Sequence, residues 1–308
     1  MVSNVDMSVD LAGIKLKNPI NTASGTYGYG WQFESFYDVS QLGAITTKGC
    51  AAEAWPGNPA PRMTEVTSGM MNSVGLQNPG VRGLIEGSGE YLQELSDKGT
   101  AVICQVAGHS VEEYVAAVEL FEELAPFAAG LEINISCPNI AAGGCAMGST
   151  PEGAAGVIRA VRPHTKKPLL VKMAPARVVD VAKALEAEGA DALTVINSIP
   201  GMAIDVNTRR SKLSRPTGGM SGPALHPIAV RMVWEVHNAV SLPIVGVGGV
   251  MTGADAAEFI LAGATSVSVG MANLVDPMAA PRILGELTEW AESQGVSSIS
   301  ELIGALEG

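Results

Sequence analysis

The sequence lacks long apolar runs, a leader pattern and closely spaced cysteines. No stretch approaches the ~20 apolar residues that a membrane-spanning helix requires, and the first residues have neither the basic charge nor the apolar segment of a signal peptide. The four cysteines, at positions 50, 104, 137 and 145, form no CxxC pair and no zinc or iron–sulfur spacing. These absences predict a reduced, cytoplasmic protein without a metal.

Basic residues are also scarce. Lysine and arginine number 19 against 31 aspartates and glutamates, which gives a formal net charge of −12. Because a nucleic-acid phosphate backbone needs a basic surface, we expect no nucleic-acid partner. An anionic ligand would depend on a few lysines, helix N-termini or backbone amides. The 47% hydrophobic content and 36 glycines indicate a globular α/β protein rich in loops.

What the sequence does contain is a series of short apolar runs that alternate with segments of helical period. Eight runs are strand candidates: 19–23, 44–47, 101–106, 131–135, 169–173, 192–196, 244–247 and 266–269. Helical periodicity marks 80–95, 111–124, 151–161, 178–188, 224–240, 254–261 and 277–292, with 33–39 as the weakest candidate. Before them, residues 7–17 alternate around Ala12–Gly13, which predicts a short β-hairpin.

Eight strands that alternate with helices predict a parallel sheet, and eight is the number at which such a sheet closes into a (β/α)8 TIM barrel. An open doubly wound sheet and two separate α/β halves are the alternatives. Against them, the chain has no early GxGxxG turn and no linker rich in proline or serine. We therefore expect one domain over residues 1–308. The connections 49–79 and 197–222, after the second and sixth strands, are too long for ordinary loops and should wall a site on the C-terminal face.

The stretch LEINISCPN at 131–139 reads as a buried strand that breaks at Pro138, because proline cannot continue a strand ladder. Cys137 is thus expected on a tight loop at the C-terminal edge of the barrel, where sites are built. A buried structural thiol is the ordinary alternative. No histidine is near in sequence, so a cysteine–histidine pair is unsupported, although a distant partner remains open. Proton abstraction by the thiol beside an electron-accepting cofactor is the chemistry that we favour.

Other strand ends carry residues suited to ligands. Gly248, Gly249 and Gly270 follow the seventh and eighth strands, where barrels bind phosphate through exposed backbone amides. A helix N-terminus near residues 252–255 is expected to add its dipole. An ordinary tight turn is the alternative for the glycine pair.

Lysines and asparagines are also expected at the C-terminal mouth of the predicted barrel. Lys48 and Lys172 end the second and fifth strands, where a cation can hold an anionic or electron-rich ligand. Amide side chains suit a planar heterocycle with carbonyl and N–H groups, although any one of them could only cap a turn. The asparagines expected at this edge are Asn72, Asn134, Asn139 and Asn197.

Several motifs occur in a fixed order along the chain. They are TTK at 46–48, NSVGLQN at 72–78, NISCPN at 134–139, IN at 196–197, GGMSGP at 218–223, GG at 248–249 and GMAN at 270–273. With these motifs the chain resembles class 1 dihydroorotate dehydrogenases, most closely the class 1B catalytic subunit, over nearly its whole length. The resemblance implies a (β/α)8 barrel that holds flavin mononucleotide (FMN) and oxidises (S)-dihydroorotate to orotate in pyrimidine biosynthesis.

The resemblance also implies residue roles. Cys137 would take the C5 proton of the substrate, while the C6 hydride goes to flavin N5. The implied substrate-binding residues are Lys48, Asn72, Ser73, Val74, Gly75, Leu76, Asn134, Asn139, Asn197 and Ser198. The implied flavin-binding residues are Ser24, Lys48, Gly49, Gln105, Asn134, Lys172, Ile196, Gly222, Gly248, Gly249, Gly270 and Met271. Gln105 departs from the asparagine usual in the family, and Ser198 and Met271 stand where threonine is common.

The segment AAGGCAMG at 141–148 resembles class 1B, and a cysteine base without a membrane-associating extension argues against class 2. Class 1B implies a partner subunit with FAD and a [2Fe–2S] cluster that passes electrons to NAD⁺, in a heterotetramer of two catalytic and two electron-transfer chains. The alternatives are a fumarate-reducing class 1A homodimer, a flavin barrel that acts on dihydrouracil, and a flavin-free barrel that binds phosphorylated metabolites.

Overall fold

The computed structural model describes residues 5–136 and 147–307, and its centre is an eight-stranded parallel sheet. In sheet order the strands run β3-β16-β15-β10-β9-β8-β7-β4. Their bounds are β3 (Ile20–Thr22), β4 (Ala44–Thr46), β7 (Ala101–Val106), β8 (Ala128–Asn134), β9 (Leu169–Lys172), β10 (Ala192–Val195), β15 (Ile244–Val247) and β16 (Ser266–Val269). All eight predicted strands are present.

The first and last strands of the sheet order meet, which closes it into a barrel. The Gly43 amide next to β4 donates to the carbonyl oxygen of Ile20 in β3 at 3.1 Å. Further along the same two strands, the Thr46 amide of β4 donates to Oγ1 of Thr22 in β3 at 3.4 Å. The predicted (β/α)8 fold is confirmed. The predicted N-terminal hairpin is also present, as β1 (Val9–Leu11) paired with β2 (Ile14–Leu16).

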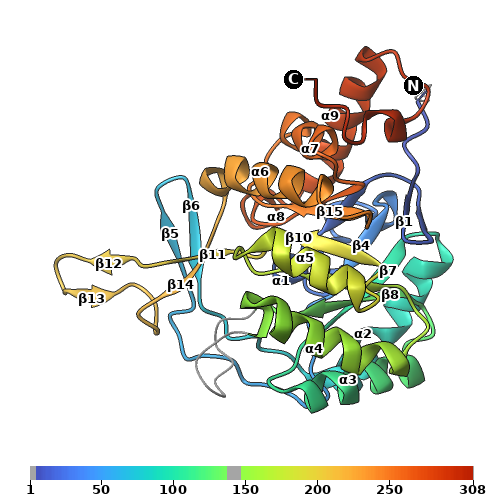
Figure 1. Cartoon of the computed structure of the whole chain (residues 1–308). Coiled ribbons are helices and arrows are strands. Elements are labelled where there is room, and N and C mark those ends of the chain that lie inside the picture. The colour runs from blue at the N-terminus through green and yellow to red at the C-terminus, as the bar shows by residue number, and fades with distance from the viewer. Residues whose placement is uncertain (1–4, 137–146, 308) are drawn as a thin grey trace.

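Helices follow the strands around the outside of the barrel (Figure 1). They are α2 (Gly80–Asp97), α3 (Val111–Leu124), α4 (Pro151–Val161), α5 (Val178–Ala187), α6 (His226–His237), α7 (Gly253–Leu261) and α9 (Ala279–Ser293), with short α1 (Ser24–Tyr27) and α8 (Ala272–Val275). Helix α4 shows how the sequence determines where such a helix begins and which face it buries. Thr150 caps its first turn by accepting from the Gly153 amide, Pro151 occupies the first helical position, and an apolar face is buried.

Two helix predictions need correction. The segment 33–39 forms no α-helix but runs between 3₁₀ turns at Trp31–Phe33 and Val39–Gln41. The carboxylate of Asp38 accepts from the Ser40 amide at 2.9 Å and so starts a new turn. The segment 224–240 divides into a 3₁₀ turn at Pro223–Leu225 and helix α6.

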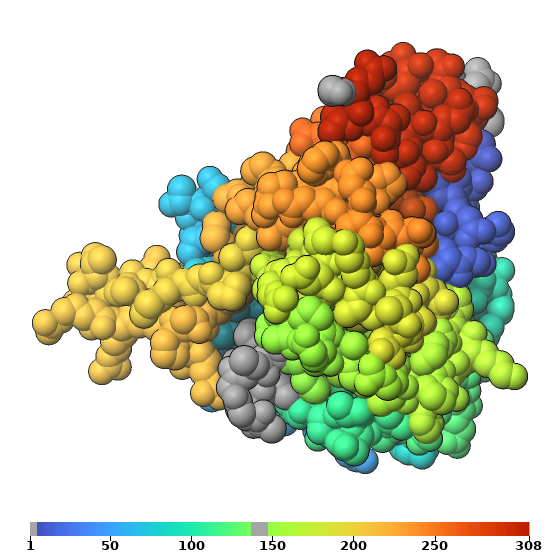
Figure 2. Space-filling model, viewed as in Figure 1, coloured from blue at the N-terminus to red at the C-terminus, as the bar shows by residue number. Residues whose placement is uncertain are grey.

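The two long connections form a second sheet over the barrel mouth. It is antiparallel, in the order β11-β14-β6-β5, with bounds β5 (Met63–Val66), β6 (Gly69–Asn72), β11 (Ile199–Gly201) and β14 (Gly218–Ser221). Between β11 and β14, the hairpin β12 (Ile204–Asp205) and β13 (Arg210–Ser211) projects from the body as an arm (Figures 1 and 2). Sequence periodicity predicted none of these strands. Among the described helices, none is long and apolar enough to cross a membrane.

Candidate active site

A cavity of about 380 Å³ lies at the C-terminal ends of the barrel strands, beneath the antiparallel sheet. It brings together most of the residues that the sequence singled out. Those that line it are Ser24, Lys48, Asn72, Ser73, Val74, Gly75, Leu76, Gln105, Asn134, Lys172, Ile196, Asn197, Ser198, Gly222, Gly248, Gly249, Gly270 and Met271. Strands β5, β6, β11 and β14 supply part of the wall, so the two long connections border this cavity.

Three of the predicted site residues do not line the cavity in the described structure. Gly49 stands behind Gln105, since a Cβ built on Gly49 would lie 2.5 Å from the Gln105 Oε1 atom. Cys137 and Asn139 lie outside the described residues.

One side of the cavity is a glycine cradle, which we define as Gly222, Gly248 and Gly249. Gly249 has a φ of +68°, and a Cβ there would lie 2.7 Å from the Gly222 carbonyl oxygen and 2.8 Å from the His226 amide nitrogen. No side chain fits in that space, so only glycine permits this approach. The ring of His226 faces the Gly248 carbonyl oxygen at 3.0 Å through Nδ1; because a carbonyl only accepts, this nitrogen carries the proton. The cradle thus presents bare backbone to the cavity.

Helix α7 does not contribute to this cradle, contrary to expectation. Its first turn is a capping box, in which Thr252 and Asp255 satisfy each other's backbone amides. The Asp255 carboxylate also accepts from the Met251 amide, and the Glu286 carboxylate accepts from the Gly253 amide at 2.6 Å. Two carboxylates therefore occupy the position where an anion would need free N–H groups. None of these residues lines the cavity.

The opposite side of the cavity carries a row of amides and hydroxyls. Asn134 ends β8, and the Tyr114 hydroxyl of α3 donates to its backbone oxygen at 2.6 Å. The Asn134 Oδ1 atom accepts from the Ser136 hydroxyl at 2.8 Å and from the Ser136 amide at 3.3 Å. Asn197, beyond β10, donates through Nδ2 to the Ser136 hydroxyl at 2.5 Å. The two loops are therefore joined across the cavity floor.

A buried charge pair lies beneath this row. Glu132, two residues before Asn134 on β8, points to the same side of the strand. Its carboxylate accepts from Gln105 and from Thr194. Burial lowers the pKa of the neighbouring Lys172 ammonium, and the charge of Glu132 opposes that shift. The Lys172 side chain therefore borders the cavity beside the Glu132 carboxylate.

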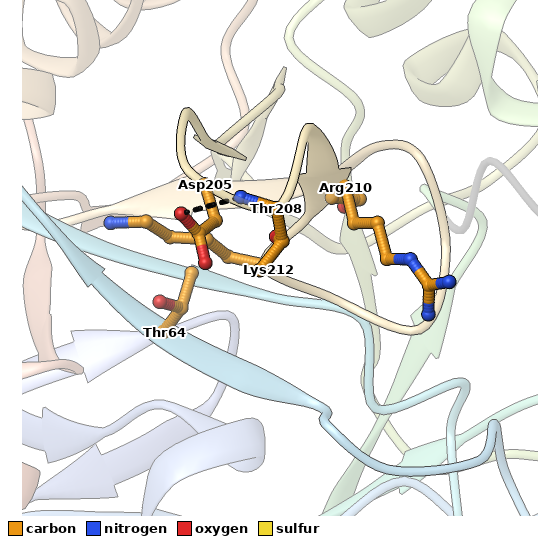
Figure 3. Close-up of a pocket in the computed structure, with 6 residues that line it drawn as sticks. Thr64, Asp205, Thr208, Arg210 and Lys212 are labelled. Atoms are coloured by element: carbon orange, nitrogen blue, oxygen red, sulfur yellow. Dashed lines mark hydrogen bonds between the residues drawn. The ribbon is translucent and has the colours of Figure 1, made fainter.

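A second hollow lies on the arm. It is lined by Thr64, Asp205, Thr208, Arg210, Ser211 and Lys212. Figure 3 shows that the Asp205 carboxylate accepts a hydrogen bond from the Thr208 amide, while the Arg210 side chain points away from it. This hollow contains none of the predicted site residues and no glycine cradle. Its charged groups belong to a projecting hairpin, so we assign the site to the barrel mouth.

Sequence reasoning assigned no role to Ser136 and did not single out Glu132. Both are buried and both hold site amides in place. A signal was present for each, since Ser136 stands inside the NISCPN motif and Glu132 is the single charge in an apolar strand. A buried carboxylate requires partners, and one of the partners of Glu132 is the predicted site residue Gln105.

The fold and the cavity define a (β/α)8-barrel protein whose mouth combines a glycine cradle with an amide-lined floor. A family model described as dihydroorotate dehydrogenase matches residues 6–290. Proteins named "Dihydroorotate dehydrogenase B (NAD(+)), catalytic subunit" from Geobacter metallireducens and Geotalea uraniireducens are 47% and 48% identical, over 98% of this chain and 98% of their own. One of the same name from Lachnoclostridium phytofermentans is 46% identical, over 98% of this chain and all of its own. The chain belongs to the dihydroorotate dehydrogenase family.

Proposed function

We propose that this protein oxidises (S)-dihydroorotate to orotate, a step of pyrimidine biosynthesis, with FMN as its cofactor and as the catalytic subunit of an NAD⁺-linked enzyme. The observation that carries the proposal is one cavity that joins a glycine cradle to a row of oriented amides. The family and the names of the relatives support the same activity.

The cavity residues fit FMN at both ends. The glycine cradle offers bare backbone to phosphate oxygens, and a Cβ on Gly249 would displace that backbone because it would clash with the Gly222 carbonyl oxygen and with His226. At the other end, Lys172 brings a buried positive charge to the site of the flavin ring, with Gln105 beside it. The remaining flavin contacts that we propose are Ser24, Lys48, Gly49, Asn134, Ile196, Gly270 and Met271. When bound, the flavin accepts the two electrons that leave the substrate.

The amides suit the substrate ring and its carboxylate. Asn72, Asn134 and Asn197, with the Ser198 hydroxyl, offer donors and acceptors to ring carbonyl and N–H groups. The Ser73 hydroxyl borders the same cavity, is buried, and has no hydrogen-bond partner among the described residues. A buried hydroxyl without a partner is costly, so a ligand atom in this place would satisfy it. We place the backbone of residues 73–76, Lys48 and Asn139 in the same substrate site.

Proton removal is assigned to Cys137. It lies outside the described residues, but it is the next residue after Ser136, which lines the cavity and is held by Asn134 and Asn197. The two buried thiols are unsuitable for the role: burial raises the pKa of Cys50 to about 11 and raises that of Cys104 as well. In the proposed reaction the Cys137 thiolate takes the C5 proton, and the double bond of orotate forms between C5 and C6.

The name "catalytic subunit" of the relatives implies a separate subunit for electron transfer. We propose that this partner carries FAD and a [2Fe–2S] cluster and reduces NAD⁺, in a heterotetramer of two chains of each kind. Purification from the native host tests this. We expect co-elution with a flavin and iron–sulfur protein, and dihydroorotate-dependent NADH formation. An isolated chain that reduces fumarate would instead favour the class 1A alternative.

A further inference from the structure

A directional chain of hydrogen bonds runs beneath the cavity. Asn197 donates to Ser136 at 2.5 Å, and Ser136 donates to Asn134 Oδ1 at 2.8 Å. Asn134 donates through Nδ2 to Gln105 Oε1 at 3.1 Å, and Gln105 donates through Nε2 to Glu132 Oε1 at 2.5 Å. Every donor in this series points toward Glu132. Amides and hydroxyls can both donate and accept hydrogen bonds. Such a series therefore keeps one direction only if the group at its end accepts hydrogen bonds and donates none.

The carboxylate of Glu132 supplies that end. Glu132 is 3% exposed, and its second oxygen accepts from the Thr194 hydroxyl at 2.6 Å. Both oxygens therefore receive donors. Lys172, on the neighbouring strand β9, provides the buried positive charge that opposes it. Because the Glu132 carboxylate accepts on both oxygens, the NH₂ group of Gln105, and not its carbonyl oxygen, faces it.

Gln105 is the amide in this chain that no backbone group holds among the described residues. The Oδ1 atoms of Asn134 and Asn197 also accept from the backbone amides of Ser136 and Ser198, so the backbone fixes those two amides at one end. Among the described residues, the side-chain amide of Gln105 has Glu132 and Asn134 as its hydrogen-bond partners, and Gln105 is 1% exposed. If Gln105 reversed, its NH₂ group would face the NH₂ group of Asn134 and its Oε1 atom would face the Glu132 carboxylate, so both hydrogen bonds would be lost.

We propose that Glu132 is a positioning residue, which acts through Gln105 to hold the NH₂ end of the Asn134 amide, whose Oδ1 end the Ser136 amide already holds, where the ligand meets it. Glu132 does not line the cavity, whereas Gln105 and Asn134 do. Its role is to set which edge of these amides donates and which accepts. This inference rests on the proposed function, because it takes orotate as the ligand.

The test is orotate affinity of the flavin-loaded protein as purified, read from the change in flavin absorbance on titration. For Glu132→Gln, we expect the orotate Kd to rise about tenfold, as one buried hydrogen bond is lost or reversed. For Gln105→Met, which cuts the same chain at its next link, we expect a similar rise. The double variant should bind orotate no more weakly than the weaker single variant, because both changes remove one connection.

Thr194→Val is the matched control. It removes the other hydrogen bond to the same carboxylate, is similar in volume, and lies outside the amide chain. Its orotate Kd should stay within about twofold of wild type. The flavin-to-protein ratio and the thermal midpoint are recorded for every variant, and the inference requires the affinity loss in variants that retain wild-type flavin content.

Wild-type affinity in Glu132→Gln overturns the inference. So does an equal loss in Thr194→Val, or additive losses in the double variant, since each points to packing and not to orientation. If Glu132→Gln does not fold, Gln105→Met decides: the inference stands on a tenfold loss in that variant and falls on none. A wild-type protein that holds flavin but binds no orotate would instead overturn the proposed function.

Discussion

The side-chain amide of Asn197 and the hydroxyl of Ser136 are joined by a hydrogen bond of 2.5 Å, although 61 residues separate them in the sequence. This bond ties the loop after β10 to the loop after β8, where the chain continues to Cys137. The Ser136 hydroxyl in turn donates a hydrogen bond to Oδ1 of Asn134. One buried serine therefore couples two amides of the proposed substrate site to the segment that carries the proposed base.

The first prediction concerns this serine. Ser136→Ala leaves the Asn197 NH₂ group without its acceptor and removes one of the two donors to Asn134 Oδ1. We expect kcat/KM for dihydroorotate to fall about tenfold or more, since unsatisfied buried groups cost about 1–3 kcal/mol. Steady-state kinetics measures the effect, and Ser293→Ala on the exposed face of α9 is the control. Equal kinetics in the two variants would remove Ser136 from the site.

The second prediction concerns the glycine cradle. Gly249→Ala places a methyl group 2.7 Å from the Gly222 carbonyl oxygen, so we expect the purified protein to lose most of its flavin. The matched control is Gly295→Ala, whose φ of +71° imposes the same backbone strain with no atom within 4 Å. The control should lose about 1–2 kcal/mol of stability but keep its flavin. The flavin-to-protein absorbance ratio measures both, and a Gly249→Ala protein with full flavin would contradict the cradle.

The third prediction follows from the pKa of Lys172, which burial lowers. The unfolded chain holds this proton up to about pH 10.4, whereas the folded state releases it earlier. Between the two values the unfolded state binds more protons, so this group makes the free energy of unfolding rise with pH. Denaturant titrations of flavin-free protein between pH 7.5 and 10 should show wild type gaining stability relative to Lys172→Met. The exposed Lys183→Met should show no such trend. A Lys172→Met difference that is constant with pH would contradict the lowered pKa.

The fourth prediction concerns Cys137. Cys137→Ala should keep FMN but lose dihydroorotate oxidation by roughly 10²–10⁴-fold, the usual contribution of a general base. Wild-type activity should rise from neutral toward alkaline pH, because a free thiol ionises near ~8.5 and the thiolate is the active form. Cys50 does not titrate in that range, since burial raises its pKa to about 11. Flavin reduction at wild-type rate in Cys137→Ala would rule out this base.

The sequence predicted the barrel well because its signals are local. Strand and helix candidates were marked by period alone, and the bounds 111–124 and 151–161 coincide with those of α3 and α4. The antiparallel sheet over the mouth was missed because β14 is Gly-Gly-Met-Ser, which has no alternation to detect. Strands β5 and β6 form a local hairpin, but β6 and β14 pair only because residues 69–72 and 218–221, far apart in the sequence, lie side by side. Such pairing depends on the completed barrel and not on nearby residues.

The candidate site, like the fold, was predictable from the sequence only where its signals are local. Strand ends could be located from the sequence, so the lysines, glycines and asparagines were found as a set. The hydrogen-bond direction set by Glu132 could not be found, because it depends on contacts among three strands. The expected dipole at α7 was wrong for a related reason. At that N-terminus the Gly253 amide donates to the carboxylate of Glu286 on α9, which lies 33 positions away in the sequence.

The most direct test of the account is a single anaerobic turnover. The isolated chain, purified with its flavin, is mixed with one equivalent of (S)-dihydroorotate, and absorbance near ~450 nm, where oxidised flavin absorbs, is followed together with orotate. The account predicts that the flavin bleaches and that orotate forms in equal amount. A protein that binds no flavin, or a flavin that stays oxidised with excess dihydroorotate, would contradict it.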